Sequence, residues 1–127
     1  MSFVKHTVGD IVKVIKSGKT PPSSILEYFD GDVNWFTPSD LGENKSLSNS
    51  KRKVSNFAVK DKKVPLFEKH TILISTTGSL IGKVGILEKS ASFNQQITGV
   101  IVYADIINYE LFYYWIKLNK VVLEKKI

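Results

Sequence analysis

The side chains that most often do catalytic chemistry are few in this sequence, and their spacing does not match that of known catalytic sites. His6 and His70 are the only histidines, and neither stands near a second His or a carboxylate at metal-ligand spacing. The chain has no Cys, which excludes disulfides, a thiolate nucleophile and a cysteine-bound metal. Ser75, His70 and an Asp form a triad only on paper, because no nucleophile elbow surrounds any Ser. The sequence therefore predicts no catalytic residue, no metal and no cofactor.

A glycine-bearing segment over residues 78–84 resembles a phosphate-binding loop but departs from it twice. Three residues separate Gly78 from Gly82, where the loop needs four, and Val84 stands where a magnesium-coordinating Ser or Thr belongs. Glycines at such positions in a strand more often mark a bend or a close backbone approach. Nucleotide hydrolysis is not predicted.

Two further patterns do not support an enzyme. Asp30 and Asp32 would be a carboxylate pair for hydrolysis, yet they flank Gly31 as turn residues do. The Pro21–Pro22 pair is preceded by Thr20 and followed by Ser23, so the Asn/Asp-Pro-Pro-aromatic catalytic motif of a methyltransferase is absent there. An enzyme is therefore the weaker interpretation.

Positive charge is concentrated in one stretch. The 127 residues hold 18 Lys and Arg against 12 Asp and Glu, a formal charge of +6. Glu43–Lys63 alone holds seven basic and two acidic residues, a net +5. Such a field attracts polyanions, although a solvated lysine-rich surface would show the same run. The pattern favours a nucleic acid or another phosphate-bearing partner.

Length and composition fit one folded domain. The hydrophobic fraction is 43% and the charged fraction 24%, both ordinary for a globular protein. No run of about 18 apolar residues is present, so no membrane span is predicted. The N-terminus lacks the apolar block of a secretory signal, and the expected location is cytoplasmic.

Short strands separated by Gly- and Pro-bearing turns predict an α+β fold, a curled β-rich sheet domain with short helices. The expected strands are Ile11–Ile15, Val33–Phe36, Thr71–Thr76, Leu80–Leu87 and Ile97–Tyr103, with a short edge strand at Lys51–Val54. Ser23–Phe29 is expected to be a helical turn capped by Ser, and Gly42–Ser50 a surface loop. Ser55 is expected to cap a brief helix that runs through Lys62.

The last part of the chain changes to a helical period. Asn108 is the expected N-cap, and apolar residues recur at Leu111, Trp115, Leu118 and Val122. This predicts a C-terminal helix over residues 108–125, following a strand-rich part over 8–107. Its broad apolar face needs a partner, which is the protein core or another chain.

Four segments occur in one order with credible gaps, and together they resemble a known family. They are Gly18–Pro21, Glu27–Leu41, Gly78–Val84 and Phe93–Gln96. Over roughly Val8–Leu118 the chain resembles the target-recognition domain of the DNA specificity subunit of type I restriction-modification systems.

The resemblance implies a non-catalytic reader of double-stranded DNA. In this family two such domains each read one half of a bipartite site, and the helices that follow them pair as an antiparallel coiled coil. The subunit assembles with modification subunits, which bind S-adenosylmethionine and methylate adenine, and with a restriction subunit. Residues 1–127 would then be a single target-recognition domain whose last helix begins the coiled-coil helix. It is one domain of a longer subunit, a shortened gene product or a half-subunit that dimerises.

DNA-binding residues are expected among the polar side chains of the basic stretch and of the shared motifs. They are Lys19, Lys45, Asn49, Lys51, Arg52, Lys53, Asn56, Lys60, Lys83 and Gln95. Lysines suit phosphates, while Arg and Asn suit base edges. Motif residues that domains reading different sequences share are expected to be scaffold, among them Gly18, Thr20 and Asn94. Trp35 is expected in the core.

Two other functions stay open at this point. The apolar face of the C-terminal helix, with Leu111, Trp115, Leu118 and Val122, is also consistent with a dimerisation or protein-interaction fragment that binds little DNA alone. An RNA-binding sheet should present stacking aromatics on its face, but Tyr113 and Tyr114 fall in the predicted helix instead.

Overall fold

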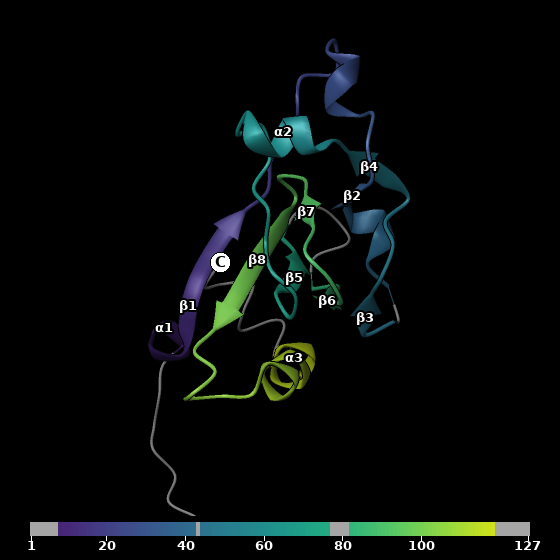
Figure 1. The fold of residues 1–127 in the computed structure, drawn as a ribbon. Helices are drawn as coiled ribbons and strands as arrows, with labels where there is room; N and C mark the ends of the chain where they lie inside the picture. Colours follow the sequence, from purple (N-terminus) through teal and green to yellow (C-terminus); the bar gives the residue numbers. More distant parts are fainter. Residues whose placement is uncertain (1–7, 43, 77–81, 119–127) are drawn as a thin grey trace, which may run out of the picture.

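A computed structural model describes residues 8–42, 44–76 and 82–118, which form two β-sheets with short helices (Figure 1). The larger sheet has five strands in the order β1-β8-β5-β6-β3, and the smaller has three in the order β4-β2-β7. The strands are β1 Val12–Ser17, β2 Val33–Phe36, β3 Ser46–Leu47, β4 Arg52–Val54, β5 Ile72–Ser75, β6 Val84–Leu87, β7 Ser92–Phe93 and β8 Ile97–Val102. The helices are α1 Val8–Ile11, η1 Leu26–Tyr28, η2 Pro38–Asp40, α2 Asn56–Lys60 and α3 Tyr109–Leu118. The expected α+β class is confirmed.

The centre of the larger sheet is apolar on both faces. Strands β5, β6 and β8 lie within segments whose β-branched sequences predict strands. Strand β5 pairs antiparallel with both β6 and β8. Because side chains alternate along a strand, Ile72 and Ile74 pack on one face, where the buried residues of α3 cover them. Leu73 points to the other face and joins a second cluster with Phe36 and Phe93. The sheet is therefore the middle layer of the fold.

The smaller sheet has its own core, which is centred on Trp35. This side chain is 1% exposed and packs with Tyr28, Val54 and Ala58. Its burial confirms the expected core position. Strand β4 lies at an edge of this sheet, as expected for the segment 51–54.

Local capping signals are confirmed in two of three helices. The Ser55 hydroxyl accepts a hydrogen bond from the backbone N–H of Ala58 at 3.2 Å, and Asn108 Oδ1 accepts from Glu110 N at 2.8 Å. The expected Ser cap before η1 is wrong, since the N-cap residue is Ile25, which forms no capping bond with its side chain. The Gly9–Asp10 pair, whose residue types favour a turn, is instead part of α1.

The prediction of a surface loop over residues 42–50 is wrong in part. Leu47 is 5% exposed, and β3 pairs in parallel with β6. The Leu47 side chain lies directly over Gly85, whose missing Cβ makes the room. A single apolar residue in a polar run gives no strand signal, so this edge strand depends on a distant contact.

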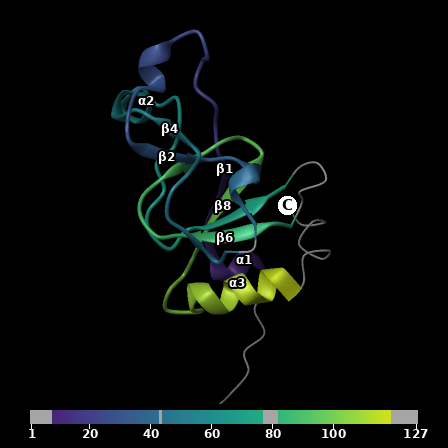
Figure 2. The same cartoon turned by 90° about the vertical axis from the view of Figure 1, so that its right-hand side faces the viewer.

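The two views agree on the overall arrangement. Helix α3 lies at one end of the molecule, while α2 and the smaller sheet lie at the other (Figure 1 and Figure 2). Within the described residues, no helix is long and apolar enough to cross a membrane.

Candidate nucleic-acid interface

Arg52 in β4 lies over the aromatic core of the smaller sheet. It is directly opposite Trp35 in the antiparallel register, and its guanidinium carbon is 4.7 Å from the Trp35 ring centroid. The same carbon is 5.8 Å from the centroid of Phe29. A guanidinium on an aromatic face is held by cation–π attraction, and this stacking leaves its in-plane N–H donors accessible. Arg52 is thus an exposed, oriented donor.

The indole of Trp35 connects Arg52 to Lys19. Trp35 Nε1 donates to the backbone oxygen of Lys19 at 3.0 Å. The Lys19 backbone N–H in turn donates to the carbonyl of Phe93 at 3.0 Å. The Lys19 side chain is exposed, but its backbone is fixed by the hydrogen bonds that its carbonyl accepts from Trp35 and that its N–H donates to Phe93.

Asn34 organises the segment that leads into β4. Its Oδ1 accepts from Ser50 N at 3.1 Å and from Lys53 Nζ, while its Nδ2 donates to the Ser48 carbonyl at 3.0 Å. Asn34 and Ser50 are buried, so the Ser50 hydroxyl is used inside the protein. Lys53 is held near β2 by the same amide.

Thr20 and Gln95 come together from opposite parts of the sequence. The Thr20 hydroxyl donates to Gln95 Oε1, and both side chains are exposed. The contact depends on Gly18, where an added Cβ would lie 2.0 Å from the Phe93 carbonyl oxygen. Only Gly fits this close approach of two backbones.

Gln96 is braced internally. Its Oε1 accepts from Asn94 Nδ2 at 3.3 Å, and its backbone N–H donates to Asn94 Oδ1 at 3.0 Å. The Gln96 carbonyl accepts from the backbone N–H of Thr76 at 3.1 Å. Thr76 follows β5, so the turn between β7 and β8 is fixed to the end of that strand.

Lys83 completes this group of residues. Its backbone N–H donates to the Ser75 hydroxyl at 3.1 Å, next to the end of β5. These contacts connect seven polar residues, which follow β1 or β5, precede β6 or β8, or, in the case of Arg52, lie in β4 opposite β2. We call them the polar end; its members are Lys19, Thr20, Arg52, Thr76, Lys83, Gln95 and Gln96.

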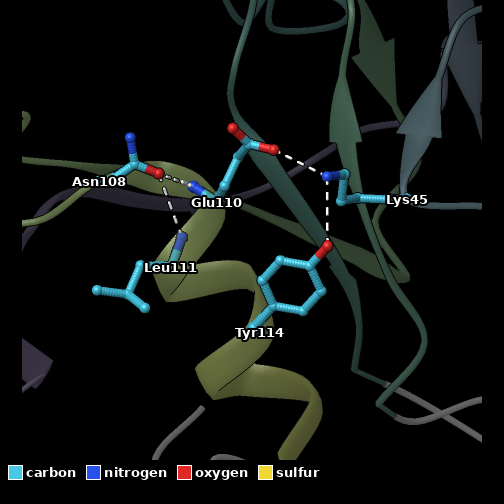
Figure 3. Close-up of polar contacts among 5 residues, drawn as sticks. All are labelled: Lys45, Asn108, Glu110, Leu111 and Tyr114. Atoms are coloured by element: carbon cyan, nitrogen blue, oxygen red, sulfur yellow. Dashed lines mark hydrogen bonds and ion pairs between the residues drawn. The ribbon is translucent and has the colours of Figure 1, made fainter.

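Lys45 lies apart from the polar end, against α3 (Figure 3). Its Nζ is 2.8 Å from Glu110 Oε2 and 3.3 Å from the hydroxyl of Tyr114. The hydrogen bonds to Glu110 and then to Tyr114 raise the pKa of Lys45 well above its ordinary value. Asn108 Oδ1 caps the same helix by accepting from Glu110 N and Leu111 N. The charge of Lys45 is thus paired within the protein.

The other predicted DNA-binding residues occupy different surroundings. Lys51 Nζ donates to the Ser39 carbonyl at 3.1 Å, and its backbone N–H donates to Asp40 Oδ1 at 3.0 Å. Asn49 is exposed just before β4, while Asn56 and Lys60 are exposed at the two ends of α2. Of the basic stretch, Arg52 therefore belongs to the polar end, whereas Lys45 is paired with side chains of helix α3.

Helix α3 uses only part of its apolar surface to pack. Phe112, Tyr113 and Ile116 are buried against the larger sheet. Leu111 is 62% exposed and Leu118 is 84% exposed, with Trp115 at 37%. The predicted interaction face is therefore exposed as far as Leu118, whereas Val122 lies outside the described residues.

His70 lies in a turn before β5, at the end of the polar segment Glu68–His70. Its backbone has a φ of 75°, and its ring stacks on Tyr109 with centroids 4.0 Å apart. Among the described residues, no three His, Cys, Asp or Glu side chains are grouped as metal ligands.

Almost the whole chain matches one known protein family. The model of the type I restriction modification DNA specificity domain matches residues 2–126. The chain belongs to this family.

A curated relative of this specificity domain has a similar sequence. The type I restriction enzyme MjaIX specificity subunit of Methanocaldococcus jannaschii is 34% identical over 101 residues, which are 78% of this chain and 23% of that subunit. The chain therefore spans less than a quarter of the length of this relative.

Solved structures show the same fold. The HsdS subunit from Thermoanaerobacter tengcongensis matches with a TM-score of 0.64 and 17% identity, over 94% of this chain and 28% of that one. The S subunit of a type I restriction-modification system from M. genitalium matches with a TM-score of 0.61 and 17% identity, over 94% and 27%. At these identities the likeness concerns the fold.

Within the specificity domain, one role is not apparent from the sequence. The shared motif predicts Thr20 to be scaffold, yet its hydroxyl bonds the exposed Gln95 side chain. The two residues are 75 positions apart, so no local pattern could connect them. Only the pairing of Gly18 with residues 93–97 brings them together.

Proposed function

We propose that this specificity domain recognises a sequence in double-stranded DNA and reads one half of a bipartite site, without catalysis of its own. The observation that carries the proposal is the match of the DNA specificity family over residues 2–126. The net charge of +6 agrees with a polyanionic partner.

The polar end is the surface that best suits this function. It offers two kinds of group, and both are needed to read DNA. Lys19 and Lys83 are point charges for phosphates, which supply most of the affinity. Arg52 and Gln95 carry N–H donors that can address base edges, which supply specificity. The remaining predicted residues, Lys45 among them, would contact DNA only if a wider surface is used.

We propose that the catalytic steps belong to partners. A domain of this family would act within a specificity subunit that assembles with modification subunits, which bind S-adenosylmethionine and methylate adenine, and with a restriction subunit. The length of the curated relative supports such a larger subunit, because this chain matches 23% of it.

A second candidate is dimerisation or another protein contact through α3. The exposed Leu111, Trp115 and Leu118 favour it, since large apolar side chains in one patch commonly mark an interface. The two functions are compatible, because helix α3 lies at the end of the molecule away from the smaller sheet (Figure 2).

Two lysines at opposite ends of one strand give a matched test of DNA binding. Lys83 precedes β6 and Lys89 follows it, so both can be changed to Ala with similar effects on the total charge. Binding to a pool of randomised duplexes is measured at several salt concentrations. If Lys83 meets a phosphate, Lys83→Ala should flatten the log–log salt slope by about 0.9, whereas Lys89→Ala should leave it unchanged.

Further variants test whether DNA binding uses the polar end alone or also the other lysines of the basic stretch. Arg52→Ala should relax preference at one base position by roughly 1–3 kcal/mol if Arg52 reads a base. Lys45→Ala should leave the salt slope unchanged, while Lys51→Ala and Lys53→Ala measure how far the phosphate track extends. A wild-type chain that binds no duplex at low salt would refute the proposed function.

A further inference from the structure

The backbone that carries Gln95 is fixed at both ends. Asn94 N donates to the Phe36 carbonyl, and Ile97 N donates to the Asn94 carbonyl, at 3.0 and 3.1 Å. On the neighbouring strand, Gly18 N donates to the Ile97 carbonyl at 3.1 Å. Gln95 is therefore an exposed residue of a short turn whose flanking residues are held by β2 and by Gly18, which follows β1.

The Gln95 side chain is held as well. Thr20 Oγ1 donates to Gln95 Oε1, which engages the acceptor half of the amide. A Gln amide has one acceptor oxygen and one NH₂ group with two donors. The group that remains for a partner is the NH₂ of Gln95, at the rim of the polar end.

We infer that Gln95 is a specificity-determining residue and that Thr20 positions it as a hydrogen-bond donor toward a base edge. This inference rests on the proposed DNA-binding function. In the major groove guanine presents O6 and N7, adenine N7 and thymine O4 as acceptors, whereas cytosine presents the N4 amino donor. Gln95 accordingly favours bases with an acceptor at its position and disfavours cytosine.

Gln96 has the same side chain as Gln95 and is also exposed, but its amide has a different hydrogen-bond partner. Its Oε1 is taken by Asn94 Nδ2, and Asn94 itself is 8% exposed. Gln96 thus stabilises the turn from within, while Gln95 is tied to another exposed side chain. Both glutamines are exposed, so the same substitution at either changes the charge of the same surface.

The deciding experiment compares Gln95→Glu with Gln96→Glu in this chain. In Gln95→Glu the introduced carboxylate keeps an oxygen for the Thr20 hydroxyl but replaces the donor by an acceptor, which suits the cytosine N4 amino group. Selection from a randomised duplex pool should show preference at one position moving toward cytosine by about 5- to 150-fold. Gln96→Glu should weaken all sequences alike, because it adds only a negative charge near phosphates.

Thr20→Val is the second variant, and it leaves Gln95 in place. It removes the hydroxyl with little change of shape, so Gln95 loses its fixed orientation. Preference at the same base position should decrease, while the salt slope stays that of the wild type.

Four results would overturn the inference. Equal effects of Gln95→Glu and Gln96→Glu on every sequence, or unchanged preference in Thr20→Val, would refute it while leaving the proposed function intact. A wild type that binds duplexes without any preference would also refute it. A wild type that binds no duplex would refute the proposed function first, and this inference with it.

Discussion

Gly18 is the residue whose lack of a side chain the polar end needs most. Its α-carbon faces two backbone carbonyl oxygens, of Phe93 and Asn94, which a Cβ would approach to 2.0 and 2.5 Å. Contacts this close force a backbone to move, and the movement would separate Thr20 from Gln95. One missing methyl group thus permits the contact between residues 18–20 and residues 93–95.

Gly18→Ala should therefore destabilise the protein by about 1–3 kcal/mol, the usual cost of overpacking. Gly42→Ala is the matched control, because an added Cβ there has no atom within 4 Å. Urea unfolding of both variants measures the difference. Equal midpoints for Gly18→Ala and Gly42→Ala would show that strands β1 and β7 can move apart at little cost.

At the residue scale, local signals are predictable from the sequence and long-range partners are not. Asn108 and Ser55 can be predicted as caps because a cap bonds the backbone two or three positions later. Lys45 and Glu110 are 65 positions apart, so the sequence does not reveal their pairing. The charge run alone predicts instead that Lys45 binds DNA. Charge counts give the sign of a field but not the partner of a side chain.

Two groups link separate elements and titrate at high pH. The Tyr28 hydroxyl donates to Asp61, which raises the pKa of Tyr28 above its ordinary 10.0 and ties η1 to the end of α2. Lys45 ties β3 to α3, and its hydrogen bond to Glu110 raises its pKa above the ordinary 10.5. In both cases the folded state favours the protonated form.

The sign of the pH dependence follows from these shifts. A group whose pKa is raised on folding stabilises the fold fully below its unfolded pKa, and this contribution disappears as the pH rises through the folded value. Stability should therefore decrease above about pH 10. The decrease should be smaller in Tyr28→Phe, which retains the stacked ring near Phe57, and in Lys45→Met.

Urea midpoints between about pH 8 and pH 11.5 measure this effect, since that range spans the ordinary pKa values of Tyr and Lys. Tyr103→Phe, at an exposed tyrosine after β8, serves as the control and should follow the wild type. Parallel curves for the wild type, Tyr28→Phe and Lys45→Met would contradict the prediction.

Helix α3 should make the chain self-associate. Leu118→Ser and Leu111→Ser remove exposed apolar surface, so sedimentation should show a shift toward monomer in these variants with little change in melting temperature. Ile116→Ala, at a buried position of the same helix, should instead lower the melting temperature by creating a cavity. A strict monomer at high concentration for the wild type would contradict self-association.

Elements are predictable when they are long or apolar. Strands β5, β6 and β8 are expected from β-branched runs, which pack well on a pleated surface. Strands β3 and β7 have two residues each, too few for any period to appear. Their position is decided by neighbours: β3 pairs with β6, and β7 pairs with β2.

At the scale of the whole molecule, the two candidate functional surfaces lie on different elements. Helix α3, which carries the exposed apolar side chains, lies at the end of the molecule away from the smaller sheet, to which Arg52 of the polar end belongs (Figure 1). A domain with this layout can face DNA and a protein partner at the same time. In the proposed function, the chemistry on DNA belongs to partner subunits.

The pure chain should therefore transfer no methyl group from S-adenosylmethionine to duplex DNA. Incubation with labelled S-adenosylmethionine and a pool of duplexes measures incorporation. A sample to which an active adenine methyltransferase is added shows that the assay works. Incorporation by the pure chain above background would contradict a purely recognising role.

The pairing of β1 with β8 has a consequence for how the chain folds during its synthesis. Val12 lies opposite Val102, so strand β1 cannot pair until β8, which is synthesised much later, is available. At roughly 5–20 residues per second, the ribosome needs several seconds to deliver β8 after β1. The hairpin of β5 and β6 forms through near neighbours in the chain, yet its β5 edge stays open until β8 arrives. Slow, late closure of the sheet, with an apolar edge exposed to aggregation in the meantime, follows from this one register.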